Sequence, residues 1–316
     1  MNRYSKILDK MPREFVLLQG TGCRWRRCEF CDYHSDVSDD PFEVNRAVLE
    51  QVTGEYGVLD VINSGSAFEL DDRTIEMLRR VIVEKKIHTL WCEMHWMYRN
   101  RLEEFRLKIT DNRLQITDLT PSPAGLPLKQ GENTSNDTKF VLNLSAGLPL
   151  KQGENTSNDV KFVSNPSAGF SLKQGENMML DYRLQSTDKG LQMSDTACRV
   201  PTIKFRCGIE TFDPELRKRW NKGVPESVTA EEVARYFQGV CLLCCTEGET
   251  RERIVRDIEL ARKHFEYFSV NVFCNNTTGI KRDQALVDWF LREVYPTIKD
   301  DPRIEVLIDN TGLGVG

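Results

Sequence analysis

Three cysteines near the start of the chain have the type and spacing of ligands for a soft metal centre. Cys23, Cys28 and Cys31 lie in the segment GTGCRWRRCEFCDYHSD, with the spacing C-x4-C-x2-C. Thiolates bind zinc or iron–sulfur clusters, and a cluster normally takes four of them. Because no fourth cysteine lies nearby, a cluster here would leave one iron open to another ligand. Zinc completed by His34 is the alternative, and the spacing alone favours neither.

The chain contains ten cysteines, and the other seven have different surroundings. We expect no signal peptide, so the thiols should be free in a reducing compartment. These cysteines are scattered or lie in apolar segments such as VCLLCC, where a free cysteine packs as a small apolar residue. We therefore expect the following in the core: Cys92, Cys198, Cys207, Cys241, Cys244, Cys245 and Cys274.

The elements that must position the cysteines alternate in type along the chain. Strands are expected over residues 14–20, 58–65, 88–95, 203–211, 239–245, 268–274 and 303–309. Helices are expected over residues 41–56, 72–86, 214–220, 229–237, 249–264 and 283–294, with Asp71 or Asp72 capping the second. This alternation predicts a parallel α/β sheet covered by helices, either doubly wound or a (β/α) barrel. Ligand sites should then gather at the carboxyl ends of the strands.

A tandem repeat interrupts this pattern. Copies that begin at Ala124, Ala146 and Ala168 share the letters KQGEN and repeat every 22 residues. They are rich in Asn, Gly, Ser, Thr and Lys and supply few core residues. We interpret residues 107–202 as an insertion, mostly disordered, between two parts of one barrel at 1–106 and 203–316. A small solenoid is the alternative.

Composition excludes several classes of protein. Of 316 residues, 40% are hydrophobic and 29% charged, and the net charge is −5. The longest apolar run is far shorter than a membrane span, and the N-terminal segment has no apolar signal region. We expect a cytoplasmic enzyme with no membrane partner. Mild acidity argues against broad binding of nucleic-acid phosphates.

The cysteine segment resembles that of the radical S-adenosyl-L-methionine (SAM) superfamily. That family typically has C-x3-C-x2-C after the first strand, with an aromatic residue before the last cysteine, where this chain has Phe30. This chain departs by one extra residue between Cys23 and Cys28. The resemblance implies a partial (β/α)6 TIM-like barrel. It also implies a 4Fe-4S cluster on Cys23, Cys28 and Cys31, which cleaves SAM to a 5′-deoxyadenosyl radical.

Two further segments match the superfamily in the expected order. NSGSAFEL follows the second strand, where the family binds the methionine amine, so the resemblance assigns Ser64, Gly65 and Ser66 to SAM. CGIETFDPELRKRWNKG resembles a family strand end followed by a helix and an N-[KR]-G turn. Glu210 in that segment would face the ribose or amino group of SAM, and Phe30 would lie beside the cofactor.

Two more segments, LWCEMHWMYRNRLEEFR and VLIDNTGLGVG, combine with the cysteine and Glu210 segments in a pattern that is most similar to the queuine lyases of this superfamily. That resemblance implies a lyase that cleaves the C–N bond of queuine and releases 7-aminomethyl-7-deazaguanine in queuosine salvage. It also implies an electron donor such as flavodoxin or ferredoxin. One alternative is a small radical SAM activating enzyme that acts on a protein partner. The remote alternative is a zinc-binding interaction protein without activity.

Polar residues at strand ends are the candidates for binding such a substrate. A guanine-like base offers N1–H and an exocyclic amine, which a carboxylate can accept as a pair. The candidates are Glu93, His95, Asn271, Asp309 and Asn310, of which Glu93 and Asp309 suit the base best. Each could instead be a solvated or structurally paired residue, and His95 could cap the following helix.

Overall fold

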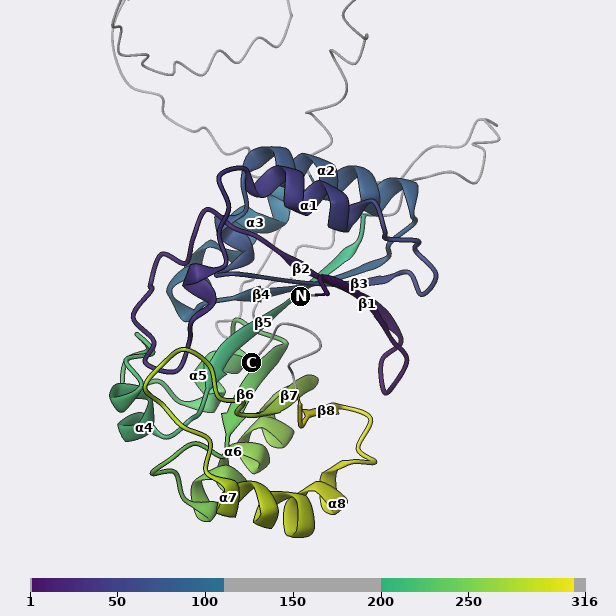
Figure 1. The fold of residues 1–316 in the computed structure, drawn as a ribbon. Helices are drawn as coiled ribbons and strands as arrows, with labels where there is room; N and C mark the ends of the chain where they lie inside the picture. The colour runs from purple at the N-terminus through teal and green to yellow at the C-terminus, as the bar shows by residue number, and fades with distance from the viewer. Residues whose placement is uncertain (1, 111–199, 310–316) are drawn as a thin grey trace, which may run out of the picture. The chain divides into compact units, whose positions relative to one another are not determined.

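A curved sheet of eight strands forms the framework of the computed structural model, which describes residues 2–110 and 200–309 (Figure 1). Its strands are β1 (Tyr4–Ile7), β2 (Arg13–Leu18), β3 (Val58–Asn63), β4 (Thr89–Met94), β5 (Thr202–Glu210), β6 (Gly239–Cys244), β7 (Tyr267–Val272) and β8 (Ile304–Leu307). The strands lie side by side in chain order; β1 is antiparallel to β2, and every later pair is parallel.

The strand order decides between the two expected topologies. A doubly wound sheet reverses its order at a switch point, whereas a barrel adds each strand beside the last. Here the order never reverses, so the sheet is of the barrel type. A side-chain ion pair joins β2 to β8, with Arg13 Nη2 2.6 Å from Glu305 Oε2. The expected partial TIM-like barrel is confirmed, and β1 is an additional strand that the sequence pattern did not indicate.

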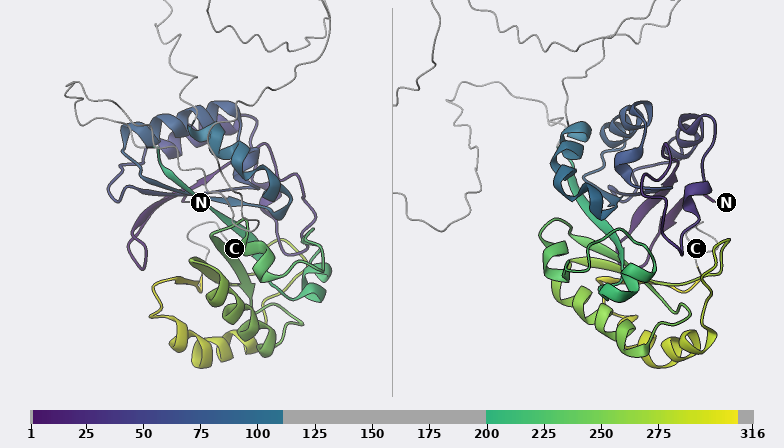
Figure 2. Two further views of the ribbon diagram at one scale, coloured as in Figure 1. Left: turned by 180° about the vertical axis from the view of Figure 1, so that it is seen from behind. Right: turned by 90° about the vertical axis from the view of Figure 1, so that its left-hand side faces the viewer.

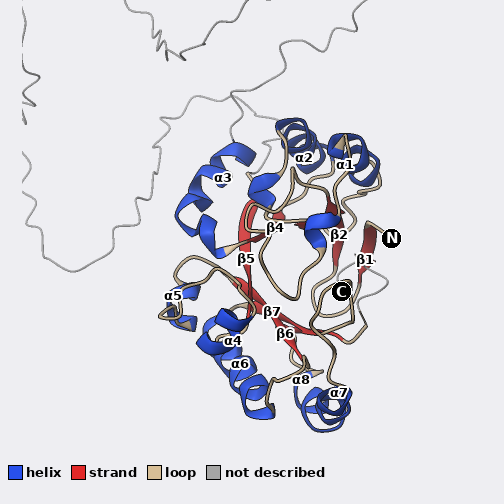
Figure 3. Ribbon diagram, turned by 60° about the vertical axis from the view of Figure 1, so that its left-hand side comes forward, coloured by secondary structure: helices blue, strands red, loops and turns tan. Residues whose placement is uncertain are grey.

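Helices cover the outer face of this sheet (Figures 2 and 3). They are α1 (Pro41–Leu49), α2 (Asp72–Glu84), α3 (Leu102–Thr110), α4 (Pro214–Arg219), α5 (Ala230–Ala234), α6 (Arg251–His264), α7 (Gln284–Trp289) and α8 (Tyr295–Ile298). Short 3-10 turns, η1 (Tyr33–Ser35), η2 (Ala67–Glu69) and η3 (Trp96–Arg101), follow β2, β3 and β4, and the π turn η5 (Phe290–Val294) joins α7 to α8. No helix among the described residues combines the length and apolarity needed to cross a membrane.

Local chemistry sets the helix ends. Asp71 caps α2, as expected, and its carboxylate accepts a hydrogen bond from the Thr74 N–H at 3.1 Å. The expectation that a helix continues to residue 56 is wrong, because α1 ends at Leu49. The Glu14 carboxylate accepts bonds from the N–H groups of Thr53 and Gly54 at 2.7 and 2.6 Å, which draws the chain out of the helix.

The strands divide their residues between two environments. In β3, Leu59 and Val61 belong to the apolar core between sheet and helices, whereas Asp60 and Ile62 line a cavity inside the barrel. Successive strand residues point to opposite faces, so one strand serves both environments. Burial on both faces accounts for the nearly continuous apolar letters of β2 and β6.

The expected insertion falls between α3 and β5. Helix α3 continues to Thr110, beyond the expected start at residue 107, and β5 begins at Thr202. The three repeat copies, and Cys198, lie outside the described residues. The described residues belong to one compact unit that is built from both parts of the chain. The described chain resumes just before the amino end of β5, at Thr202.

Candidate active site

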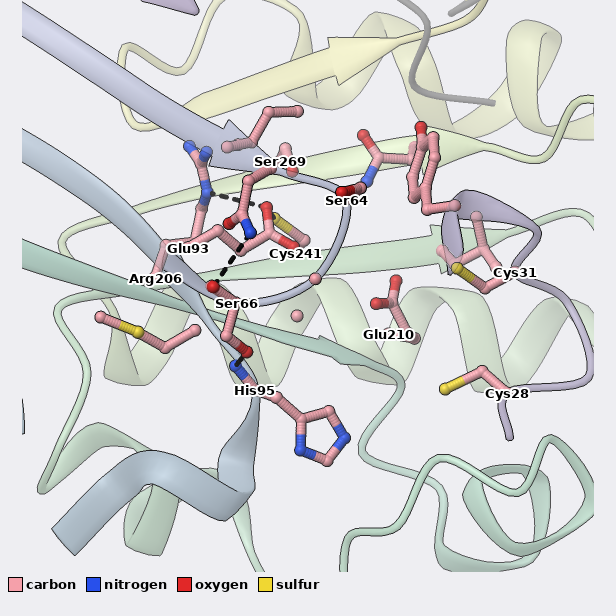
Figure 4. A pocket seen from close by; sticks show the side chains of 18 of the residues that line it. Cys28, Cys31, Ser64, Ser66, Glu93, His95, Arg206, Glu210, Cys241 and Ser269 are labelled. Atoms are coloured by element: carbon pink, nitrogen blue, oxygen red, sulfur yellow. Dashed lines mark hydrogen bonds and ion pairs between the residues drawn. The ribbon is translucent and has the colours of Figure 1, made fainter. Parts of the chain in front are cut away.

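A cavity runs inside the barrel, lined by alternate residues of the strands and by the loop after β2. All three cysteines of that loop line it, and so do Ser64, Gly65, Ser66, Glu93, His95, Glu210, Asn271 and Phe30. Figure 4 shows Cys28 and Cys31 at one side of this space, with Glu93, Arg206 and Cys241 at the other and Glu210 between them. Residues that are far apart in the sequence therefore share one enclosed site.

The cysteine loop presents partly buried thiols to the cavity. Cys23 Sγ accepts a hydrogen bond from the Arg26 N–H at 3.4 Å, and the Cys31 N–H donates to the Cys28 carbonyl at 3.3 Å. Burial raises the pKa of the Cys31 thiol to about 12 and also raises the pKa of Cys28, while the nearby Lys222 ammonium opposes both shifts. These thiols become thiolates readily only when a cation or cluster compensates their charge.

The donor set tests the two metal alternatives. Among the described residues, no three His, Cys, Asp or Glu side chains come close enough together to hold one metal ion. A tetrahedral zinc site needs its ligands to converge on one point, so Cys23, Cys28, Cys31 and His34 do not fit it as arranged. An iron–sulfur cluster takes each thiolate on a different iron. Three thiols that line one end of a common cavity fit that requirement.

Trp25 anchors the cysteine loop to the turn after α4. Its indole Nε1–H donates to the Asn221 carbonyl at 2.7 Å, and its ring stacks on His95 with centroids 5.8 Å apart. Gly223, at φ +73°, lies under the ring, and an added Cβ there would be 2.5 Å from Trp25. Only glycine gives both the left-handed backbone and this clearance.

His95 links the same turn to the end of β4. Its Nδ1 accepts a hydrogen bond from the Met97 N–H at 3.1 Å, so it caps η3. Its Nε2 lies 2.8 Å from the Lys222 carbonyl and, in the tautomer that this arrangement requires, donates to it. Burial and the Lys222 charge lower the pKa of His95 to about 3, which keeps the ring neutral. Both ring nitrogens are therefore engaged within the protein.

The segment after β3 lies directly against the cysteine loop. Ser64 Oγ accepts a hydrogen bond from the Gly20 N–H at 3.1 Å, and Ser66 Oγ accepts one from the His95 N–H at 2.9 Å. Gly65 has no room for a side chain, because an added Cβ would lie 3.0 Å from Cys23 Cα. Glycine at this position therefore allows two backbone segments to meet at the cavity wall.

Glu69 joins these segments, and its role was not indicated by the sequence pattern. One carboxylate oxygen accepts from the Arg24 N–H at 2.8 Å and the Tyr98 hydroxyl at 2.9 Å, while the other accepts from the Ser66 N–H at 2.8 Å. The side chain is buried. Its position three residues after Ser66 is a capping-box spacing, which could have indicated it.

Glu210 and Lys222 form a buried ion pair beside the cysteines. Lys222 Nζ lies 2.9 Å from Glu210 Oε1 and 5.3 Å from the centre of the Phe30 ring. Glu210 ends β5 with φ +67°, after a register shift at Gly208. A non-glycine residue held in this region stores strain, which is common at functional sites. Lys222 is a second residue that the sequence reasoning missed, although it is the lysine of the quoted N-K-G turn.

Buried charges fill the amino-terminal end of the cavity. Asp60 binds both Arg13 and Arg206, each at 2.9 Å, and Arg13 also binds Glu305. Burial alone would raise the pKa of Asp60, but the two guanidinium groups outweigh it and lower that pKa. Arg206 has a further contact with Glu93, Nε to Oε2 at 3.8 Å. None of Arg13, Asp60, Arg206 or Glu305 was a candidate from the sequence, because the candidates were sought at the carboxyl ends of the strands and these four residues lie before those ends.

Glu93 is a carboxyl group at the amino-terminal end of the cavity, and its nearest cationic partner among the described residues, Arg206, is 3.8 Å away. Burial raises its pKa, and Arg206 only partly offsets that effect. Cys241 Sγ donates to Glu93 Oε2 at 3.5 Å. Cys241 is buried, as expected, and its inward position on β6 also makes it part of the cavity wall. Of the others, the described ones are buried as expected: Cys92, Cys207, Cys244, Cys245 and Cys274.

The remaining candidates differ in position. Asn271 lies buried in the cavity wall, and its Oδ1 has no hydrogen-bond partner among the described residues. Asp309 is exposed beyond β8 and is not one of the residues that line the cavity. Asn310 lies outside the described residues.

The chain resembles one solved structure over its whole length. Queuine lyase from Clostridium spiroforme, solved bound to SAM and queuine, is 30% identical; the match covers 100% of this chain and 99% of that chain, with a TM-score of 0.68. The chain belongs to the queuine lyase family of radical SAM proteins. No protein-family model and no curated protein matched it. Radical SAM membership implies an enzyme that uses SAM and an iron–sulfur cluster.

The radical SAM assignment agrees with the chemistry of the cavity. The cysteine loop, the Ser64–Ser66 segment and Glu210 were assigned to one cofactor site by resemblance, and they line one space. The roles of these individual residues stay predictions. Substrate contacts do too, and here the geometry separates Glu93 and Asn271, which line the cavity, from Asp309, which does not.

Proposed function

We propose that the chain is a radical SAM lyase that cleaves the C–N bond of queuine and releases 7-aminomethyl-7-deazaguanine and a cyclopentenyl product. The observation that carries the proposal is the full-length match to a queuine lyase bound to SAM and queuine. The cavity supports it, because it offers thiols at one end and polar, hydrogen-bonding groups at the other. An enclosed space of mixed character suits a small polar base better than a macromolecule.

Cys23, Cys28 and Cys31 would hold a 4Fe-4S cluster. When bound, such a cluster supplies the electron that cleaves SAM at its sulfonium. Lys222 places a positive charge near Cys28 and Cys31, which favours their thiolates. The chain therefore contributes three ligands and a fixed compensating charge.

Ser64, Gly65, Ser66 and Glu210 would bind SAM. Because Gly65 has no side chain, its backbone can lie against Cys23 at the wall of the proposed cofactor site. Lys222 Nζ lies 2.9 Å from Glu210 Oε1 and holds that carboxylate in position, where it can accept hydrogen bonds from ribose hydroxyls or an ammonium. The strained backbone at Glu210 fixes where that carboxylate lies.

Glu93 and Asn271 would recognise the deazaguanine base. An ionised Glu93 can accept from N1–H and the exocyclic amine together, and Arg206 stabilises that ionised form. Asn271 carries a buried carbonyl oxygen that has no partner among residues 2–110 and 200–309, which is costly unless a ligand supplies a donor. Glu93 replaces Asp309 as the preferred carboxylate, because it lines the cavity.

Anaerobic turnover tests this proposal. Reconstituted protein, reduced with dithionite and incubated with SAM and queuine, should form 7-aminomethyl-7-deazaguanine, detected by mass spectrometry. The Cys23→Ala, Cys28→Ala and Cys31→Ala variants should each form none. The proposal would be overturned in favour of an activating enzyme by two results together. Queuine would leave the rate of SAM cleavage unchanged, and turnover would be seen only after a protein partner is added.

A further inference from the structure

The loop that follows β7 contacts the cysteine loop on both sides of Cys31. Asn276 Nδ2 donates a hydrogen bond to the Phe30 carbonyl at 2.7 Å. Thr277 donates twice to Asp32 Oδ2, from its N–H at 3.1 Å and from its Oγ1 hydroxyl at 2.9 Å. The residues before and after Cys31 are therefore both held by one segment that lies far away in the sequence.

The peptide group between Phe30 and Cys31 is bound at both of its polar atoms. Its oxygen accepts from Asn276, and its N–H, which belongs to Cys31, donates to the Cys28 carbonyl at 3.3 Å. Because a peptide group is planar, hydrogen bonds at its oxygen and at its nitrogen fix its orientation. The place of the Cys31 thiol at the cavity depends on that plane and on the anchored Asp32 (Figure 4).

Contacts within the loop set which end of the Asn276 amide faces the cysteine loop. Its Oδ1 accepts from both the N–H and the hydroxyl of Thr278, at 3.0 and 2.7 Å. An amide oxygen accepts and an amide nitrogen donates, so these two donors leave Nδ2 for the Phe30 carbonyl. Asn276 therefore makes a hydrogen bond that an aspartate of the same shape cannot make.

The far end of this loop is fastened to the neighbouring turn after β6. The Glu247 N–H donates to the Lys281 carbonyl and the Asp283 N–H donates to the Cys245 carbonyl, both at 2.8 Å. The near end continues directly from β7, so the loop is fixed at both ends. A support of this kind can position a ligand residue, because it does not follow the movements of the cysteine loop.

We propose that Asn276 and Thr277 are positioning residues for Cys31, which hold its two neighbours and so direct its thiol to the cluster. This role rests on the proposed function, because the cluster is what the thiol would bind. Neither Asn276 nor Thr277 lines the cavity, so they would act through Cys31. Residues that orient a metal ligand strengthen metal binding, because less freedom is lost when the metal arrives.

This brace differs from the one at Trp25. Trp25 ties the part of the loop between Cys23 and Cys28 to the turn after α4, whereas Asn276 and Thr277 act at the last cysteine. Loss of the second brace should therefore affect Cys31 and leave Cys23 in place.

Release of iron from the reconstituted full-length protein, reduced with dithionite and mixed with the chelator ferrozine, tests this role. Asn276→Asp removes the donor to Phe30, and Thr277→Val removes the hydroxyl that binds Asp32. The double variant should release iron about 10-fold faster than wild type. Asn276→Ala/Thr277→Val, which adds no charge, should agree with it, and Thr277→Ser should release iron at the wild-type rate because it keeps the hydroxyl.

A matched control removes a hydrogen bond that stays within the same loop. Asn275 Oδ1 accepts from the Arg282 N–H at 2.9 Å. Asn275→Ala should therefore release iron within about 2-fold of the wild-type rate, because the contacts to Phe30 and Asp32 remain.

Alkylation of the protein without added iron gives a readout that a general loss of stability would not give. With iodoacetamide, peptide mass spectrometry should show Cys31 modified about 5-fold faster in Asn276→Asp/Thr277→Val than in wild type, because its thiol becomes more accessible. Cys23 should react at an unchanged rate.

The contrary results separate this role from the proposed function. Equal iron release from wild type and the double variant, or equally fast release from Asn275→Ala and the double variant, would overturn the role and leave the proposed function standing. Equal acceleration of alkylation at Cys23 and Cys31 would overturn it too, since it would show a general loosening of the fold. A wild-type protein that assembles no cluster would overturn the proposed function and, with it, this role.

Discussion

At the scale of single residues, the site contains buried charged groups that compensate one another. Lys222 and Glu210 are both buried and satisfy each other at 2.9 Å, and the lysine also offsets the raised thiol pKa of Cys28. Glu93 is held next to Arg206 but at 3.8 Å, so it keeps a raised pKa. Glu210 therefore has a close cationic partner, whereas that of Glu93 is more distant.

The Glu93 carboxyl predicts a pH dependence of queuine binding. Because its pKa is raised, Glu93 takes up a proton at a higher pH than an exposed carboxyl does, and the protonated form cannot accept both hydrogen bonds of the base. Queuine affinity should therefore fall as pH decreases through that raised pKa. Glu93→Gln should bind queuine more weakly by about 10-fold, with a flat pH profile. Calorimetric titration with queuine, from pH 8 downwards, measures the affinity and its pH dependence. If Glu93→Gln kept the same pH dependence as wild type, the assignment of Glu93 would be contradicted.

The Lys222–Glu210 pair predicts a coupled loss of stability. Lys222→Met leaves a buried carboxylate without a partner and should lower the free energy of unfolding by about 3 kcal/mol. Adding Glu210→Gln to that variant removes the unpaired charge and should recover more than half of the loss. Urea unfolding of the wild type and the variants, each without added iron, measures these differences in the free energy of unfolding. A double variant no more stable than Lys222→Met would show that the two residues are not coupled.

At the scale of elements, the alternation of side chains between the two faces of each strand positions the residues of the site. One face of each strand packs against helices, and the other places Asp60, Glu93, Arg206 and Cys241 inside the barrel. The cysteine loop is then fixed to the turn after α4, since Trp25 is hydrogen-bonded to Asn221. The loop therefore depends on a distant turn for its position.

That dependence is testable at Gly223. Gly223→Ala places a methyl group 2.5 Å from Trp25 and keeps a residue with a side chain at φ +73°. It should cost about 2 kcal/mol of stability and lower the iron bound after reconstitution. Gly279→Ala is the control, because its added Cβ meets no atom within 4 Å. Iron content equal in the two variants would show that the anchor does not position the loop.

The sequence was sufficient for the seven parallel strands, the cysteine loop and the Asp71 cap, because period and spacing are local signals. It was not sufficient for the charged end of the cavity. Arg13, Asp60 and Arg206 are far apart in the sequence, and only their pairing in space compensates the burial of their charges. The early end of α1 was missed for the same reason, since its cause is Glu14, which is distant in sequence.

At the scale of the molecule, the cysteine loop and the point where the chain re-enters the sheet lie at opposite ends of the strands. The cysteine loop follows the carboxyl end of β2, whereas the chain re-enters the sheet at the amino end of β5, at Thr202. A connection from helix to strand in an α/β unit needs only about 2–6 residues. We therefore expect the barrel to form without the segment between α3 and β5.

Replacement of residues 111–199 by a short Gly-Ser linker should accordingly leave a folded protein that binds iron. Loop-closure entropy grows slowly with length, so stability should change by no more than about 2 kcal/mol. Thermal unfolding and iron content of the shortened chain measure this. Loss of the folded barrel would show that the segment contributes to it.

The central claim is that Cys23, Cys28 and Cys31 hold one cluster to which SAM binds inside this cavity. Electron paramagnetic resonance of the anaerobically reconstituted, dithionite-reduced protein, recorded with and without SAM, tests it most directly. We expect about four iron and four sulfide per chain, a 4Fe-4S signal that changes when SAM is added, and no such signal in the triple Cys→Ala variant. Stoichiometric zinc without sulfide, or a cluster signal that SAM leaves unchanged, would contradict it.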